Sequence, residues 1–445
     1  MLSLRQRIRN LFTTAEGLLL VVTGWEALAV AFLSLFSGPL AAWGVPARLG
    51  LALDPAGRVG RIIMLYHALA VPFVAALVYL ILDALPFDER TPRLVRPTIT
   101  LGYLLASGGA IAFAYFRAGW IAHGLFLVGL SLVFYAGVVL AWGLFPWRSD
   151  LVEGFSWERL AFWLVAVYTL VSAALGGAAG AYFGNGFTAF LAEDVVREPH
   201  NLGQRAIIAH LHIMLTLVDV ALLLLVARRF RLKGRAYKVA IPLTVVGTTI
   251  VTFATWSVLF AEKIAHRIIN VGSAFLLPGA LLVALWGFAQ LAREGGSRGR
   301  LRGVFRDPIR FGMLFELVFV NFVVTIPGVY VAFNLETYRQ PAYLEVERAF
   351  AVGHWHVLAT LSAVVALFLV ADRLDVRGLL RQVLGWGALA GSTLAFVFVQ
   401  FYLFRAPGQD VAWTVPFFEV GIALFLVALA VWLGERLWWI ITGRA

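Results

Sequence analysis

The stretch Val352-Gly353-His354-Trp355-His356-Val357-Leu358 places two histidines inside a long apolar segment. A second His-x-His pair, His210-Leu211-His212, lies in another such segment, and a single histidine, His67, takes the corresponding place in a third. The steps between them are nearly equal, because 210 − 67 = 143 and 354 − 210 = 144. This spacing predicts a threefold internal repeat with imidazoles near its centre.

The composition is that of an integral membrane protein. Hydrophobic residues make up 61% of the 445 residues and charged residues only 14%, which leaves too little polar surface for a soluble core of this size. Apolar runs of about 20 or more residues are long enough to cross a bilayer as helices. The predicted spans are twelve in number: 17–43, 59–85, 95–118, 120–146, 157–184, 201–229, 237–262, 265–292, 308–334, 348–372, 378–404 and 411–434.

The repeat and the spans together predict an all-α fold of twelve transmembrane helices in three pseudo-symmetric four-helix arcs. The repeat units are 17–146, 157–292 and 308–434, and the chain 1–445 is expected to form a single transmembrane domain. The histidines lie on the second helix of each unit. At about 1.5 Å per residue, all of them fall roughly one-third of the way in from the outer face.

The net charge of +11 is distributed as expected for a membrane protein, which argues against nucleic acid as a partner. Lys and Arg concentrate at the amino terminus and in the connections 228–238 and 293–310. The positive-inside rule puts these connections, and both termini, on the cytoplasmic side. We therefore expect a multi-pass protein of the prokaryotic inner membrane, in contact with the lipid bilayer, with its histidines near the outer face.

Histidine is the only iron ligand that the sequence offers in quantity. The chain has no cysteine and only four methionines, which excludes disulfides, thiolate ligation, iron–sulfur clusters and covalent c-type haem attachment. An imidazole inside a membrane is costly without a partner, and haem iron is the partner that we expect. Residues i and i+2 of a helix point about 200° apart, so each His-x-His pair serves two cofactors, one on either side.

A ring of the three histidine helices, all turned in the same rotational sense, gives a specific pairing. His67 and His356 would then clamp one iron. His354 and His212 would face each other across the next gap, and His210 would face a third gap in which no ligand stands opposite it.

The segment 352–358 resembles the helix of haem-copper oxidase subunit I that carries two haem-ligating histidines, in a family that includes oxygen reductases and nitric oxide reductases. Twelve spans in pseudo-threefold arcs are also similar to that family. The resemblance implies that His354 is the proximal ligand of the active-site haem, and that His356 and His67 bind the low-spin haem. It further implies that Arg405, between the last two spans, holds haem propionates.

The sequence departs from this family at the copper site. The family takes one copper ligand from helix six and an adjacent His-His pair from helix seven, but the span 237–262 contains no histidine. Copper would be poorly held without three imidazoles. The His-x3-Tyr pattern of oxygen reductases is also missing, because Thr216 stands four residues after His212. We therefore expect two haems, of b type, and no copper.

Three functions are compatible with these features. In the first, His212 and His354 ligate a second low-spin haem, and the protein transfers electrons within a respiratory complex. In the second, His354 holds a five-coordinate haem beside a non-haem metal bound by His212 with Glu262 or His266, and His210 is a further candidate ligand; this protein would reduce nitric oxide or oxygen. In the third, the histidines serve a proton-coupled transporter without haem.

The electron donor must lie outside this sequence in either haem-based function. The chain contains neither a dicopper domain nor a c-type haem motif, since it has no cysteine. We expect electrons from other respiratory subunits, from a cytochrome or cupredoxin, or from quinol. Whether the chain is itself an oxidoreductase or the electron-transfer subunit of one is left open by the sequence.

Overall fold

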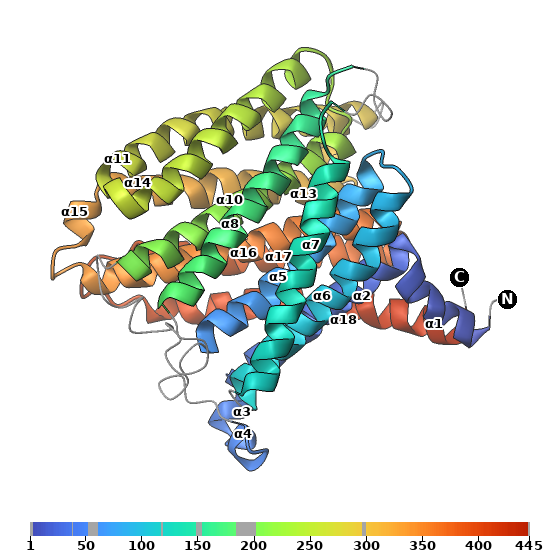
Figure 1. The fold of residues 1–445 in the computed structure, drawn as a ribbon, viewed down its shortest axis with the longest axis horizontal. Coiled ribbons are helices and arrows are strands. Elements are labelled where there is room, and N and C mark those ends of the chain that lie inside the picture. Colours follow the sequence, from blue (N-terminus) through green and yellow to red (C-terminus); the bar gives the residue numbers. More distant parts are fainter. Residues whose placement is uncertain are drawn as a thin grey trace. The chain divides into compact units, whose positions relative to one another are not determined.

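The computed structural model describes residues 3–37, 39–51, 61–116, 119–147, 154–183, 202–295 and 300–443. Helices are the only regular secondary structure in these ranges (Figure 1). Eleven of the described helices are long and apolar enough to cross a membrane. The prediction of an all-α, multi-pass membrane protein is confirmed at this level. Helices dominate because each satisfies its own backbone hydrogen bonds, which lipid cannot do.

The chain divides into two compact units, which we describe separately. Unit 1 comprises Met1–Asn10, Val218–Val251 and Lys263–Ala445, and unit 2 comprises Leu11–Leu217 and Thr252–Glu262. The three predicted arcs stay a prediction.

Unit 2 is built from long apolar helices that pack through small residues. Its helices are α2 (Ala15–Ser37), α3 (Pro39–Ala42), α4 (Val45–Arg48), α5 (Arg61–Ala84), α6 (Arg90–Tyr115), α7 (Trp120–Gly143), α8 (Trp157–Phe183), the first part of α10 (Leu202–Arg229) and the helical segment Thr252–Glu262. Helices α6 and α7 approach closely: a Cβ on Gly109 would lie 2.7 Å from the backbone nitrogen of Phe126. Such close contact between backbones is typical of membrane helices, where dispersion and not the hydrophobic effect drives packing.

A buried arginine ties several helix ends of unit 2 together. The guanidinium of Arg159 donates to the main-chain carbonyls of Phe145 (3.2 Å), Pro86 (3.0 Å) and Gly143. Its rigid set of N–H donors suits several carbonyls at once. This residue therefore fixes the beginning of α8 against the end of α7 and the residues that follow α5 and α7.

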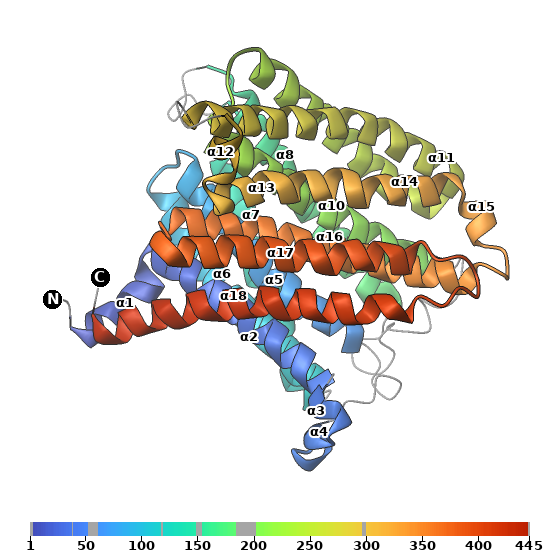
Figure 2. The ribbon, with the colours of Figure 1, turned by 180° about the vertical axis from the view of Figure 1, so that it is seen from behind.

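Unit 1 contains the remaining helices (Figure 2). They are the end of α10, α11 (Gly234–Glu294) apart from its residues Thr252–Glu262, α12 (Arg300–Phe305), α13 (Pro308–Val318), the π-helical turn η2 (Phe319–Val324), α14 (Thr325–Phe333), α15 (Leu335–Tyr338), α16 (Leu344–Arg373), α17 (Gly378–Leu403), the 3-10 turn η3 (Ala412–Thr414) and α18 (Val415–Thr442). The helix α1 (Leu4–Thr13) contributes Arg7, whose guanidinium donates to the carbonyl of Ile440 at the end of α18 (2.6 Å).

Helix α11 is broken into two arms at Ala261, where the backbone leaves helical geometry (φ −144°, ψ 69°). The arms run antiparallel, because Gly247 packs on Leu276 and Gly272 packs on Val251. At about 1.5 Å per residue, an unbroken helix of 61 residues would far exceed the thickness of a bilayer. The break falls at the end of the predicted span 237–262, next to the predicted span 265–292.

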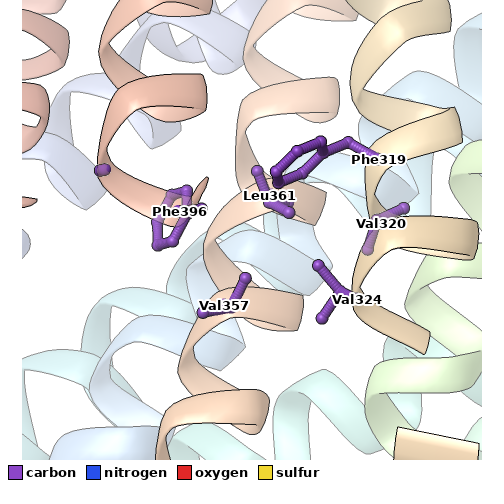
Figure 3. Packing of buried hydrophobic residues seen from close by; sticks show 7 residues of the cluster. Phe319, Val320, Val324, Val357, Leu361 and Phe396 are labelled. Carbon is purple, nitrogen blue, oxygen red and sulfur yellow. The ribbon is translucent and has the colours of Figure 1, made fainter. Parts of the chain in front are cut away.

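A hydrophobic core of unit 1 lies between α16, α17 and the π-helical turn η2 (Figure 3). Its buried side chains are Phe319, Val320, Val324, Val357, Leu361, Ala395 and Phe396. Three of them, Phe319, Val320 and Val324, lie in the π-helical turn. The hydrophobic pattern of the sequence did not indicate this irregularity, which is often associated with functional sites.

An ion-pair network closes one end of unit 1. The guanidinium of Arg381 bonds both carboxylate oxygens of Asp307 (2.9 and 2.8 Å) and one oxygen of Asp372 (2.7 Å). Arg229 pairs with the second oxygen of Asp372. The network joins α10, α16 and α17 with the residue that precedes α13, and its bidentate geometry is the strong form of such contacts.

Candidate functional site

His67 lies on α5 in unit 2, with its imidazole in a fixed orientation. Its Nδ1 lies 2.8 Å from the carbonyl oxygen of Ile63, one turn earlier in the same helix. Phe126 of α7 meets the ring edge-on, with centroids 5.5 Å apart and planes at 84°. Since a carbonyl can only accept, Nδ1 carries the proton and Nε2 carries the lone pair.

His210 lies on α10 and is oriented by the neighbouring helix α8. Its Nδ1 lies 3.0 Å from the carbonyl oxygen of Ser172. The hydroxyl of Ser172 in turn accepts a hydrogen bond from Nε1 of Trp256 (3.1 Å), and this serine is fully buried. The same reasoning gives His210 a protonated Nδ1 and a lone pair on Nε2. The serine that orients this ring is itself bonded to Trp256.

The structure brings His67 and His210 together. Their ring centroids are 6.4 Å apart and their planes differ by only 19°. Gly176 of α8 makes room for the second ring, because a Cβ at this position would lie 2.5 Å from Cε1 of His210 and closer still to Nδ1. By contrast, no described atom lies within 4 Å of a Cβ built on Gly177.

His212 uses its own helix in the way that His67 does. Its Nδ1 lies 3.0 Å from the carbonyl oxygen of Ile208, whereas His210 bonds across to α8. The two members of this His-x-His pair are therefore held by different helices, as expected for side chains about 200° apart.

His354 and His356 on α16 also differ in their surroundings. His354 is buried and stacks on Phe350, with centroids 5.2 Å apart and planes at 17°. Its Cε1 and Nε2 lie against Gly328 of α14, where an added Cβ would be 2.8 Å from each atom. His356 is exposed.

The predicted ligand pairs join residues of different units. His67 and His212 belong to unit 2, whereas His356 and His354 belong to unit 1. The pairs His67–His356 and His354–His212 therefore stay predictions. The pair that the structure assembles within one unit, His67 with His210, occupies the gap in which we expected no ligand opposite His210.

The other predicted site residues have local partners. Arg405 donates from Nη1 to the carbonyl of Tyr402 (3.0 Å) and its guanidinium lies 4.3 Å from the centre of that ring. Glu262 forms an ion pair with Arg205 at 3.7 Å. His266 belongs to unit 1 and Glu262 to unit 2, so the proposed non-haem metal set stays a prediction.

A buried polar contact accompanies the π-helical turn of unit 1. The side-chain amide of Asn321 donates to the carbonyl of Leu317 (3.0 Å) and lies 3.4 Å from Oδ1 of Asp219. One turn earlier, the fully buried Glu316 accepts a hydrogen bond from the hydroxyl of Ser392. Polar side chains at such depth are costly and are therefore often functional.

Two glycines, Gly176 and Gly328, are the site residues that sequence reasoning missed. Each lies where a side chain would collide with an imidazole of a neighbouring helix. The general signal exists, since small residues mark close approach between membrane helices. With 42 glycines in the chain, however, composition could not single out these two.

The imidazoles of His67 and His210 are donors of the type that fills the axial positions of haem iron. Within the described ranges, no three side chains of His, Cys, Asp or Glu are grouped so that they could hold a metal ion. Structural zinc needs about four protein donors, whereas haem iron takes four nitrogens from its own ring and needs only axial ligands. Comparison with family models and with curated proteins finds no match to this chain.

Proposed function

We propose that this chain is a haem-binding membrane protein that transfers electrons within a respiratory complex. The proposal depends on one observation: His67, His210 and His212 each form a hydrogen bond from Nδ1 to a main-chain carbonyl oxygen. Iron-ligating histidines characteristically bond the other ring nitrogen in this way, which fixes the tautomer and orients the ring. Three imidazoles whose Nδ1 atoms all bond main-chain carbonyls support a shared role as ligands.

The proposal includes an architecture and an orientation. We count the two arms of α11 as separate crossings, which with the ten other apolar helices gives twelve. The resemblance to haem-copper oxidase subunit I then extends to the topology, in a form without the copper ligands. Both termini lie in the cytoplasm of a prokaryotic cell, and two b-type haems lie near the outer face of the inner membrane.

Each element of the site has a definite task in this function. Haem iron, when bound, supplies the exchange of one electron between the ferric and ferrous states. The histidines would hold the iron, the carbonyls of Ile63 and Ser172 orient two of the rings, and Gly176 leaves space for one of them. The long apolar helices exclude water, and the propionates would find a cation at Arg405.

Absorption spectroscopy with metal quantification tests the proposal directly. The purified protein should show a Soret band, low-spin bands on reduction, about two irons per chain and no copper. Added carbon monoxide should leave the reduced spectrum unchanged, because six-coordinate iron has no open position. A protein without a Soret band would refute the proposal, and a spectrum shifted by carbon monoxide would favour the reductase.

A further inference from the structure

The separation of His67 and His210 matches two imidazoles that bind one metal from opposite sides. Metal–nitrogen bonds are about 2.0 Å, and a five-membered ring with sides of about 1.33 Å has a radius of about 1.1 Å. Two bonds and two radii give a centroid separation of about 6.2 Å. The observed separation is 6.4 Å.

We infer that His67 and His210 are the two axial ligands of a single haem, held within unit 2. This assignment rests on the proposed function and specifies its ligands. It differs from the pairing implied by the haem-copper oxidases, in which His67 shares its iron with His356. One imidazole presents a single Nε2 lone pair, so His67 serves one of these two partners and not both.

The surroundings of the pair support this assignment. Both Nδ1 atoms are engaged by main-chain carbonyls, so the two Nε2 lone pairs are the ones available to iron. Ser172, whose carbonyl orients His210, also accepts a hydrogen bond from Trp256 through its hydroxyl. Gly176 provides the space for the ring, and Phe126 borders His67 with an apolar edge.

Haem is the ligand class because, among the described residues, two imidazoles are the donors that meet here. A zinc or copper ion would need further protein ligands, and no group of three suitable side chains occurs in the described part of the chain. A haem requires two axial nitrogens and an otherwise apolar slot. The near-parallel ring planes also predict a property of the ferric state, namely a rhombic low-spin electron paramagnetic resonance signal. Perpendicular planes would give a strongly anisotropic signal instead.

The test compares haem content and resonance spectra of the purified full chain and its variants. We expect His67→Ala and His210→Ala each to lose one haem per chain and the same rhombic signal. The double variant should lose no more than either single variant, because both residues hold one cofactor. His356→Ala should keep this signal, and Leu211→Ala is the matched control beside His210.

Loss of folding is controlled by chemical rescue. His210→Gly with added imidazole should regain the rhombic signal, whereas a variant that has merely misfolded would not. The pairing is overturned if the wild type binds haem but His210→Ala keeps every haem, or if the double variant loses more haem than either single one. A wild type that binds no haem refutes the proposed function itself, which is a different result.

Discussion

A single methyl group at Gly176 provides a sharp test of how His210 is seated. In Gly176→Ala, the new Cβ would lie 2.5 Å from Cε1 of His210, whereas ordinary contact begins at 3.4 Å. The ring must therefore move by at least 3.4 − 2.5 = 0.9 Å, or α8 must shift away from α10. Alanine is a better helix former than glycine, so the substitution should not weaken the helical backbone of α8.

The expected effects follow from this displacement. Rotating an imidazole well away from its preferred torsion costs about 0.5–1.5 kcal/mol and lengthens the bond from Nδ1 to the Ser172 carbonyl. Disturbing the support of a metal ligand typically weakens binding about 10- to 100-fold. We therefore expect Gly176→Ala to release haem 10- to 100-fold more readily and to weaken the rhombic signal, while the helical content is unchanged.

The matched control lies one residue further along the same helix. A Cβ on Gly177 meets no described atom within 4 Å, so Gly177→Ala should bind haem as the wild type does. Haem loss is measured by transfer to excess apomyoglobin, followed at the Soret band, with circular dichroism as the check on folding. Equal haem retention by Gly176→Ala and Gly177→Ala would refute the seating of His210 against α8.

Three further changes test other parts of the structure. Gly328→Ala would press on Nε2 of His354 and should alter a haem spectrum, whereas Gly434→Ala, whose Cβ meets no described atom within 4 Å, should not; an unaltered Gly328→Ala spectrum would argue against a ligand role for His354. Arg381→Ala removes the link between two aspartates and should lower the free energy of unfolding by about 1–3 kcal/mol, less than for a fully buried pair; thermal unfolding in detergent measures this, and an unchanged midpoint would contradict it. Glu262→Gln should leave the iron content unchanged, because its carboxylate pairs with an arginine; loss of one iron would revive the non-haem metal site.

Much of the helical architecture could be predicted from the hydrophobic runs. The predicted span 157–184 is observed as Trp157–Phe183, and 378–404 as Gly378–Leu403. These boundaries are predictable because the transition from lipid to water changes the composition abruptly. The π-helical turn at Phe319–Val324 was not, since it interrupts no apolar run and depends on how α16 and α17 pack beside it.

The contact between His67 and His210 could not be read from the sequence, although both residues could be identified as candidates. Our ring of three helices assumed one rotational sense for all of them, which placed His210 opposite a position without a ligand. The observed orientation of His210 depends on α8, through the Ser172 carbonyl and the space at Gly176. The periodicity of hydrophobic residues describes one helix at a time. It cannot predict a contact between two helices that depends on a third helix.

The spacing in His-x-His explains how one helix can take part in two sites. On α10, His210 bonds across to α8 while His212 bonds back to its own helix. On α16, His354 is buried against Gly328 while His356 is exposed. Both pairs thus separate their imidazoles onto different sides, as about 200° between i and i+2 requires. If His210 serves a haem with His67, then the other members of the two His-x-His pairs, His212, His354 and His356, stay candidate ligands of the second haem. His67→Ala and His210→Ala are expected to affect the first haem, and His356→Ala is expected to leave that haem in place.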